Sequence, residues 1–176
     1  MNKLPLFGRE KPRLLVFSAK SRSFFIIALF LAVPAFWLHA EPAEFFIGIP
    51  GEVNLYSRQD MAFGGGLFFG LGGDGMAMGI RALYCRDMDN FQSLEVTAFV
   101  RLYLPDISGN SGLFAQISLG PVMFWEEDND EKRGVYCAGL GLGWRFLLGE
   151  YWFVEPSLRG GYPFLAGAGV AAGFRM

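Results

Sequence analysis

The segment from Glu41 to the C-terminus lacks histidine, because the only histidine of this 176-residue chain is His39. Hydrolases and acyltransferases commonly use histidine as their general base, so this segment lacks the usual catalytic group of such enzymes, and we expect no catalytic residues. Basic charge is scarce as well. The segment keeps 9 of the 15 Lys+Arg and 16 of the 17 Asp+Glu, which gives it a net charge of −7. Nucleic-acid binding therefore has no electrostatic support.

Long apolar runs are also missing after residue 40, although 52% of the chain is hydrophobic. No stretch there reaches the roughly 18 apolar residues that a transmembrane helix needs. Before Glu41 the chain is different: a basic leader is followed by the apolar stretch Phe24 to Leu38 and then by Leu38-His39-Ala40. This order is typical of a secretory signal. We expect a signal peptide over 1–40, cleaved after Ala40, and a mature domain over 41–176.

The last forty residues alternate with a period of two. Successive strand residues point to opposite faces of a sheet, so the two sets describe two faces. One set is bulky and apolar: Tyr136, Ala138, Leu140, Leu142, Trp144, Phe146, Leu148, then Trp152, Val154, Pro156, Leu158, then Phe164, Ala166, Ala168, Val170, Ala172, Phe174. The other set is glycine-rich and charged, and it includes Arg145, Glu155, Arg159 and Arg175. A glycine-rich and charged face cannot be a hydrophobic core, so the apolar face is expected to contact lipid.

The same alternation continues through the rest of the mature segment, which turn residues divide into separate strands. We expect strands near 44–57, 61–71, 76–86, 91–104, 113–126, 136–148, 152–159 and 164–176. In lipid every backbone group of a spanning sheet must be paired, so the sheet has to close. The sequence therefore predicts an all-β fold: an eight-stranded, antiparallel, up-and-down transmembrane β-barrel after an N-terminal signal peptide. The connections after the odd-numbered strands are all short in this division.

The inward positions carry charge of both signs, whereas the apolar band carries none. We expect one lumen network of ion pairs from Glu52, Arg81, Glu95, Arg101, Arg145, Glu155, Arg159 and Arg175. Two interpretations stay open: a gated or leaky pore lined by these groups, or a solid ion-pair plug that fixes the strand register. We favour the plug, because eight strands leave an interior that side chains fill. Arginine suits such bidentate pairing better than lysine.

Three segments near the C-terminus carry a resemblance: Gly141-Leu-Gly-Trp-Arg-Phe, Trp152-Phe-Val-Glu-Pro and Arg159-Gly-Gly-Tyr-Pro-Phe, followed by the final Ala-Gly-Phe-Arg-Met. They resemble the C-terminal half of small outer-membrane β-barrel proteins of the spirochaete type, and more loosely the OmpA/OmpX class. The resemblance covers about the last forty residues and implies an outer-membrane location, but no biochemical activity. Barrels of this kind commonly end on an aromatic residue, whereas this chain has Phe174 at the right parity and ends on Met176.

Neither a metal nor a cofactor is expected. The acidic stretch Glu126–Glu131 has carboxylate oxygens that suit a hard cation, but it lacks the turn glycine and the ligand spacing of a calcium loop. We therefore expect a solvated loop tip there. Cys85 and Cys137 fall on the third and sixth strands, which lie almost opposite each other, whereas a disulfide needs Cα atoms within about 7 Å. We expect two separate thiols.

Three prolines fit a closed barrel poorly. Pro50, Pro121 and Pro156 lie within expected strands and each removes a ladder donor, so we expect β-bulges nearby. The pairing of the first strand with the eighth rests on closure alone.

The leading hypothesis is an integral outer-membrane barrel with a structural or surface role and no catalytic activity. Its expected partners are outer-membrane lipid and the barrel assembly machinery during insertion; we expect no nucleic acid and a monomer. Two alternatives stay open. One is a narrow outer-membrane channel, and the other is a soluble, lipocalin-like periplasmic barrel that binds a lipophilic ligand. The second alternative requires an apolar interior and a polar exterior.

Overall fold

The computed structural model describes residues 44–56, 61–73, 75–88, 91–104, 111–126 and 129–176. The expected signal peptide and its cleavage site lie outside these ranges. Eight strands follow one another in the described part: β1 (Glu44–Tyr56), β2 (Met61–Gly73), β3 (Met76–Asp87), β4 (Phe91–Tyr103), β5 (Gly112–Glu126), β6 (Asn129–Leu148), β7 (Trp152–Tyr162) and β8 (Phe164–Arg175). No helix in the described ranges is long and apolar enough to cross a membrane.

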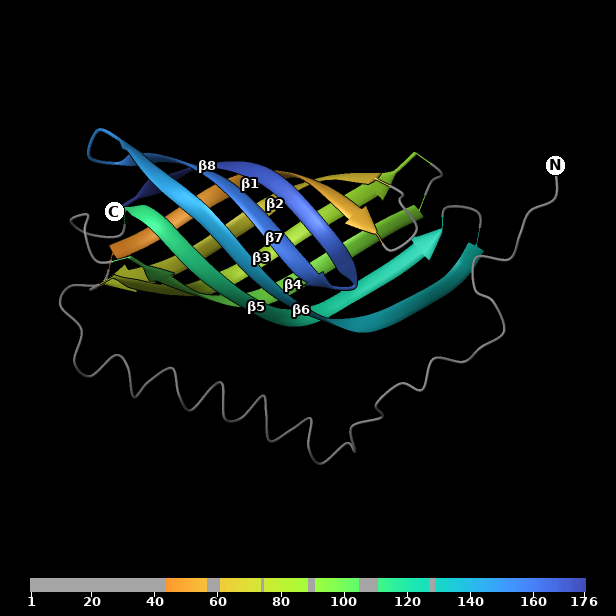
Figure 1. Cartoon of the computed structure of the whole chain (residues 1–176). Helices are drawn as coiled ribbons and strands as arrows, with labels where there is room; N and C mark the ends of the chain where they lie inside the picture. Colours follow the sequence, from red (N-terminus) through yellow and green to blue (C-terminus); the bar gives the residue numbers. More distant parts are fainter. Residues whose placement is uncertain (1–43, 57–60, 74, 89–90, 105–110, 127–128) are drawn as a thin grey trace, which may run out of the picture. The chain divides into compact units, whose positions relative to one another are not determined.

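The eight strands form a closed antiparallel barrel in sequence order (Figure 1). The expected pairing of β1 with β8 is confirmed, with Phe46 opposite Arg175 and Tyr56 opposite Phe164. The register can be followed once around the wall from Tyr162 back to β7. It passes through Ala138, Leu119, Ala98, Ile80, Phe69, Ile47 and Phe174 and returns at Trp152. The path leaves β7 at Tyr162 and returns to it at Trp152, ten residues away. The strands are therefore strongly tilted and staggered, as closure of a small barrel requires.

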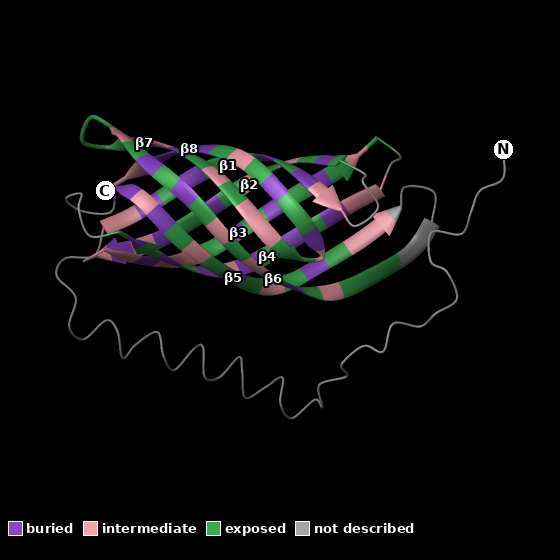
Figure 2. Ribbon diagram, in the orientation of Figure 1, coloured by how far each residue is buried: buried purple, intermediate pink, exposed green. Residues whose placement is uncertain are grey.

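The two faces are those that the sequence predicts, with one exception. Phe164 was expected on the outward face but is 3% exposed and packs in the lumen, because the β1–β8 register shifts between Leu55 and Tyr56. Along β1 and β4, buried and exposed residues alternate one by one (Figure 2). The outward face exposes large apolar side chains on every strand, for example Ile49, Leu67 and Leu140 at 65%, 55% and 66%. The inward face holds buried charges such as Glu95 and Arg145. This polarity is the reverse of what a lipocalin-like barrel needs.

One expectation about the inward face was incomplete. It carries large aromatic side chains as well as glycine and charge, namely Phe46, Phe68, Phe99, Phe114 and Phe153, each at most 2% exposed. Facing glycines make room for these rings. An added Cβ at Gly173 would overlap the ring of Phe153 and the carbonyl oxygen of Ile47, and one at Gly143 would overlap the ring of Phe114. Each of these rings thus fills the space that a glycine leaves on the neighbouring strand.

The β5–β6 hairpin is longer than the sequence suggests. The acidic stretch Glu126–Glu131 was expected to be a loop, but β5 continues to Glu126 and β6 begins at Asn129, so this expectation was wrong for 129–131. Residues 127–128 lie outside the described ranges. Pairing of β6 with β7 begins only at Ala138 opposite Tyr162. Before Ala138, β6 therefore pairs with β5 alone, at Asn129 and from Arg133 to Cys137, and β6 extends past the end of β7 (Figure 1).

The expected bulges at the prolines are not found. At Pro50, Pro121 and Pro156 one ladder skips two residue pairs and then resumes in the same register. In each case the ladder on the other side of the strand stays continuous. The missing N–H therefore interrupts hydrogen bonding locally without shifting a strand. The two register shifts that do occur lie near the same end of the barrel, at Leu55/Tyr56 and at Phe124/Glu126.

Candidate functional site

The centre of the lumen holds a ring of four alternating charges from four strands. Arg81 donates from Nη1 to Glu52 Oε1 at 2.7 Å and from Nη2 to Glu95 Oε1 at 2.6 Å. Arg159 donates from Nη1 to both carboxylate oxygens of Glu95 at 2.9 Å, and its Nε lies 2.9 Å from Glu52 Oε2. No side chain in this ring is more than 12% exposed. The ring is electrically neutral and joins β1, β3, β4 and β7.

A second group lies nearer the end of the barrel at which β1 begins and β8 ends. Arg101 on β4 donates from Nη1 to both oxygens of Glu155 at 2.9 Å, and Arg145 on β6 donates from Nε to Glu155 Oε1. Gln116 on β5 accepts a hydrogen bond from Arg101 Nε at 2.6 Å. Gln116 was not among the expected network residues, although its inward parity places it on the same face.

Aromatic rings enclose this second group. The Arg101 guanidinium carbon lies 4.6 Å from the ring centroid of Phe114 and 4.7 Å from that of Phe99. The Arg145 guanidinium carbon lies 4.5 Å from the centroid of Phe46 and 4.3 Å from that of Phe153. Aromatic faces stabilise cations that have lost part of their water, so these rings help to offset the cost of burying the two arginines.

The opposite end of the lumen carries a second aromatic cluster. Tyr56 lies at its centre, with ring centroids 5.1 Å from Phe164, 6.0 Å from Phe91 and 6.1 Å from Phe124. Its hydroxyl forms a hydrogen bond with Ser93 Oγ at 3.0 Å. The charged ring is thus bounded along the barrel axis by aromatic side chains on one side and by the enclosed Arg101–Arg145–Glu155 group on the other.

Both cysteines lie in this part of the lumen as buried free thiols. Cys85 packs with Ala62 and Leu83, and Asn54 donates to its Sγ at 3.4 Å. Cys137 packs with Val122 and Phe164.

Seven of the eight expected network residues lie in the two lumen groups, but Arg175 does not. Its Nη1 lies 3.5 Å from Glu44 Oε2 and its Nε donates to the Glu150 carbonyl oxygen at 2.8 Å, so it lies at the rim where β1 begins and β8 ends. The reason is its position: it is the last residue of β8, where the lumen already ends. Within the described ranges no group of three or more His, Cys, Asp or Glu residues is placed to hold a metal ion.

Aromatic side chains also mark both ends of the outward apolar band. At the hairpin end, Gln92 Oε1 accepts hydrogen bonds from Tyr84 Oη at 2.8 Å and from Trp125 Nε1 at 3.0 Å. At the other end, where β8 finishes, Phe174 packs against Tyr151 and Trp152. Rings with one polar atom suit the boundary between hydrocarbon and water. The outward surface thus has the layered character of a membrane-spanning barrel.

Comparisons with solved structures agree with this fold. The chain is similar to the N-terminal β-barrel domain of Pseudomonas aeruginosa OprF, at 19% identity and a TM-score of 0.53, over 76% of this chain and 97% of that one. It is also similar to Neisserial surface protein A, at 14% identity and a TM-score of 0.54, over 78% of this chain and 98% of the other. The sequence matches no protein-family model and no curated protein. The chain therefore has the fold of small eight-stranded transmembrane β-barrels, of the kind that the OmpA/OmpX resemblance implies.

Proposed function

We propose that this chain is an integral outer-membrane protein with a structural or surface role and no catalytic activity. The observation that carries the proposal is the division of polarity across the wall: apolar side chains outside, and ion-paired arginine and glutamate inside. Such an exterior is stable only against hydrocarbon. Export through a cleaved signal peptide and insertion by the barrel assembly machinery remain part of this proposal.

The lumen supports a plug in preference to a channel. In eight-stranded barrels the side chains fill the interior. Here Arg81, Glu95 and Arg159 cross the centre, and the Tyr56 cluster and the Arg101–Phe114 region pack on either side. Several ion pairs join strands that are not neighbours, such as β1 with β3 and β4 with β7, so the network ties distant parts of the wall together.

Recording from planar lipid bilayers tests this closed state against the channel alternative. With the protein inserted from detergent, we expect no reproducible step conductance above the bare bilayer, because the described lumen has charged and aromatic groups along its length. Steps whose anion-to-cation preference changes in Glu95→Gln would contradict the plug and support a narrow channel. A channel-forming β-barrel protein whose conductance steps are known, recorded in the same membrane, serves as the positive control.

A further inference from the structure

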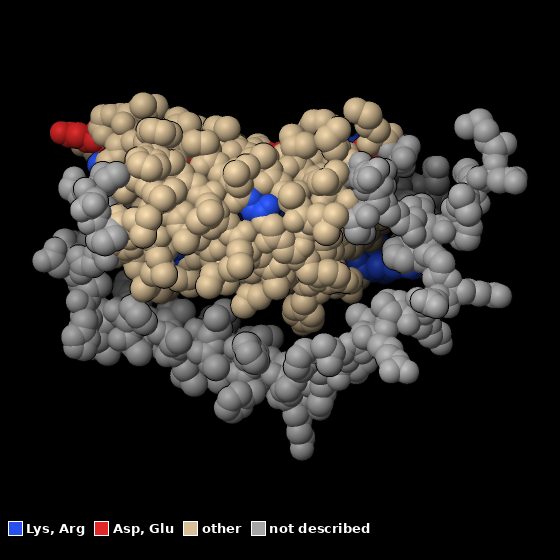
Figure 3. Space-filling model, in the orientation of Figure 1, with Lys and Arg blue, Asp and Glu red and all other residues tan. Residues whose placement is uncertain are grey.

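An outward arginine lies at the hairpin end of the barrel. Along β3 the exposed outward positions run from Ile80 through Ala82 and Tyr84 to Arg86. Strand residues rise about 3.4 Å each, so Arg86 lies about 7 Å beyond Tyr84 along the strand. Figure 3 shows that one face of the barrel is almost uncharged between its two ends. If Tyr84 marks the edge of the hydrocarbon, Arg86 reaches the lipid head groups, whose layer is about 5–7 Å thick.

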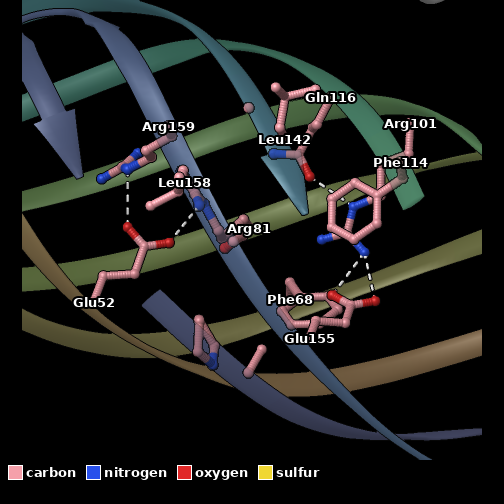
Figure 4. Close-up of a pocket in the computed structure, with 14 residues that line it drawn as sticks. Glu52, Phe68, Arg81, Arg101, Phe114, Gln116, Leu142, Glu155, Leu158 and Arg159 are labelled. Atoms are coloured by element: carbon pink, nitrogen blue, oxygen red, sulfur yellow. Dashed lines mark hydrogen bonds and ion pairs between the residues drawn. The ribbon is translucent and has the colours of Figure 1, made fainter. Parts of the chain in front are cut away.

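The arginines of the lumen are not accessible to a ligand outside the wall. Arg81 and Arg159 form ion pairs with Glu52, as Figure 4 shows. Their side chains are at most 12% exposed. Arg86 differs from them, since it is exposed on the outward side of β3. An anion in the surrounding membrane can therefore reach Arg86 directly.

Gln92 of β4 lies opposite Arg86 on the same face of the sheet. Its Oε1 accepts hydrogen bonds from Tyr84 Oη at 2.8 Å and from Trp125 Nε1 at 3.0 Å. An indole N–H can only donate, so the atom that it meets is the amide oxygen, and the orientation of the amide group is fixed. Nδ2 then lies on the other branch of the amide and donates to no described residue. Opposite side chains of an antiparallel pair have Cβ atoms about 4.5–5.5 Å apart, so one anion can contact both Gln92 Nδ2 and the Arg86 guanidinium.

The chemistry of this pair suits a phosphate group. The Arg86 guanidinium has five N–H donors, which can serve more than one acceptor, and it binds phosphate oxygens through two parallel hydrogen bonds. The next residue, Asp87, falls at an inward position, where its Oδ1 accepts a hydrogen bond from the Phe91 backbone N–H at 2.8 Å. The outward row from Arg86 through Gln92 to Trp125 therefore combines cationic and neutral donors with an aromatic ring, and it contains no acidic residue.

We propose that Arg86 and Gln92 bind the phosphate group of a membrane phospholipid. Arg86 donates from its guanidinium group and Gln92 donates from Nδ2 to the phosphate oxygens. The acyl chains lie along the outward face past Tyr84 and Leu94, which are register partners and are 40% and 38% exposed. A lipid phosphate matches this place because it carries a negative charge at the head-group level and an apolar part beside the aromatic border. The proposal rests on the proposed membrane location and assigns one lipid site on that surface.

Native mass spectrometry of the detergent-folded protein tests this site, with dioleoylphosphatidylglycerol as the probe. Dioleoylglycerol, which has the same acyl chains and no phosphate group, is the matched ligand control. We expect a one-to-one adduct with the phospholipid. Binding of dioleoylglycerol should be roughly tenfold weaker, which is the effect of about one lost hydrogen bond to a charged group. Equal binding of the two lipids overturns the proposal.

Arg86→Gln and Lys132→Gln are the matched protein variants. Each removes one exposed positive charge near the hairpin end, but Lys132 lies on β6, which is separated from β4 by β5. Arg86→Gln should weaken the phospholipid adduct roughly tenfold, and Lys132→Gln should leave it unchanged. Equal losses in the two variants would show that the lipid responds to overall charge alone, and would overturn the site.

Gln92→Glu tests the amide donor. The substitution keeps an oxygen that accepts from Trp125 Nε1, but it replaces Nδ2 with a carboxylate oxygen that repels phosphate. We expect this variant to lose the adduct, and an adduct that persists overturns the role of Gln92.

Heat-modifiability in SDS, measured on the same preparations, separates this proposal from the proposed function. A protein that forms a heat-modifiable barrel but binds both lipids equally contradicts the phosphate site alone. A protein that forms no such barrel contradicts the membrane location and the lipid site together.

Discussion

Glu95 is the acceptor on which the central ring depends. It is 1% exposed and receives hydrogen bonds from Arg81, Arg159 and the Thr97 hydroxyl. A buried pair contributes little net stability compared with apolar residues of the same shape, but removal of one partner leaves the other charge uncompensated. At the residue scale, the ring is therefore more sensitive to loss of a single member than to its complete replacement.

Substitution Glu95→Gln tests this sensitivity. It keeps the size of the side chain but removes the negative charge that two arginines share, so we expect the free energy of unfolding in micelles to fall by about 3–5 kcal/mol. Urea titration followed by circular dichroism measures the change. Glu150→Gln, on the exposed turn after β6, is the matched control and should change it by less than about 0.5 kcal/mol. An equal response of both variants would show that the ring is not a stabilising unit.

The glycine–phenylalanine contacts make a second prediction at this scale. An added Cβ at Gly173 would overlap the Phe153 ring, whereas one at Gly51 has ordinary space around it. We expect Gly173→Ala to destabilise the folded protein by about 1–3 kcal/mol, the usual cost of overpacking, and Gly51→Ala to have little effect. The same urea titration measures both. A neutral Gly173→Ala would mean that Phe153 is free to move aside.

At the scale of the single strand, the alternation decides where charge is tolerated. Leu140 on β6 is 66% exposed in the outward apolar band, whereas Gly134 lies on the part of the same strand that pairs with β5 alone and has no atom within 4 Å of an added Cβ. Two positions on one strand thus share a face but differ in environment.

The pair Leu140→Arg and Gly134→Arg measures this difference. An arginine at the lipid midplane of a barrel costs about 2–4 kcal/mol, and one near or beyond the interface costs about 0–1 kcal/mol. We expect Leu140→Arg to lower the yield of folded protein in lipid vesicles sharply, with Gly134→Arg close to the unsubstituted protein. Equal folding of both variants would contradict the assignment of lipid to the outward face.

The strand pattern was predictable from the sequence because period-two alternation is a local property. Strand positions near Glu44, Phe91 and Trp152 agree with the structure within a few residues. The β5–β6 hairpin was not predictable, because the acidic residues after Glu126 have the composition of a loop, while pairing in the extended hairpin depends on the partner strand. The effect of the prolines on the ladders likewise depends on which side of each strand the missing N–H faces.

The lumen site was predictable only in part. Parity identifies which charges point inward, but not their height along the barrel, which follows from the stagger of ten residues. Glu52, Arg81, Glu95 and Arg159 come to one level through that stagger, whereas Arg175 comes to the rim. The aromatic residues around Arg101 lie at inward positions of their strands. A phenylalanine at an inward position was therefore the sequence signal that could have predicted the aromatic part of the lumen.

At the scale of the described barrel, one polarity pattern accounts for the fold and for the proposed location. The wall closes through β1 and β8, the exterior is apolar between two aromatic borders, and the interior holds ion pairs, several of which join non-neighbouring strands. Because closure removes both sheet edges along the paired length, the barrel can exist in hydrocarbon without unpaired ladders except at the three prolines.

Electrophoretic heat-modifiability tests this account most directly. The protein, folded in detergent, is run in SDS with and without boiling, and its β-content is checked by circular dichroism. A closed, lipid-facing barrel resists SDS until it is heated, so we predict a clear mobility difference between the two samples. An identical mobility, together with solubility in plain buffer, would contradict a membrane barrel and would mean that the apolar face is covered in another way.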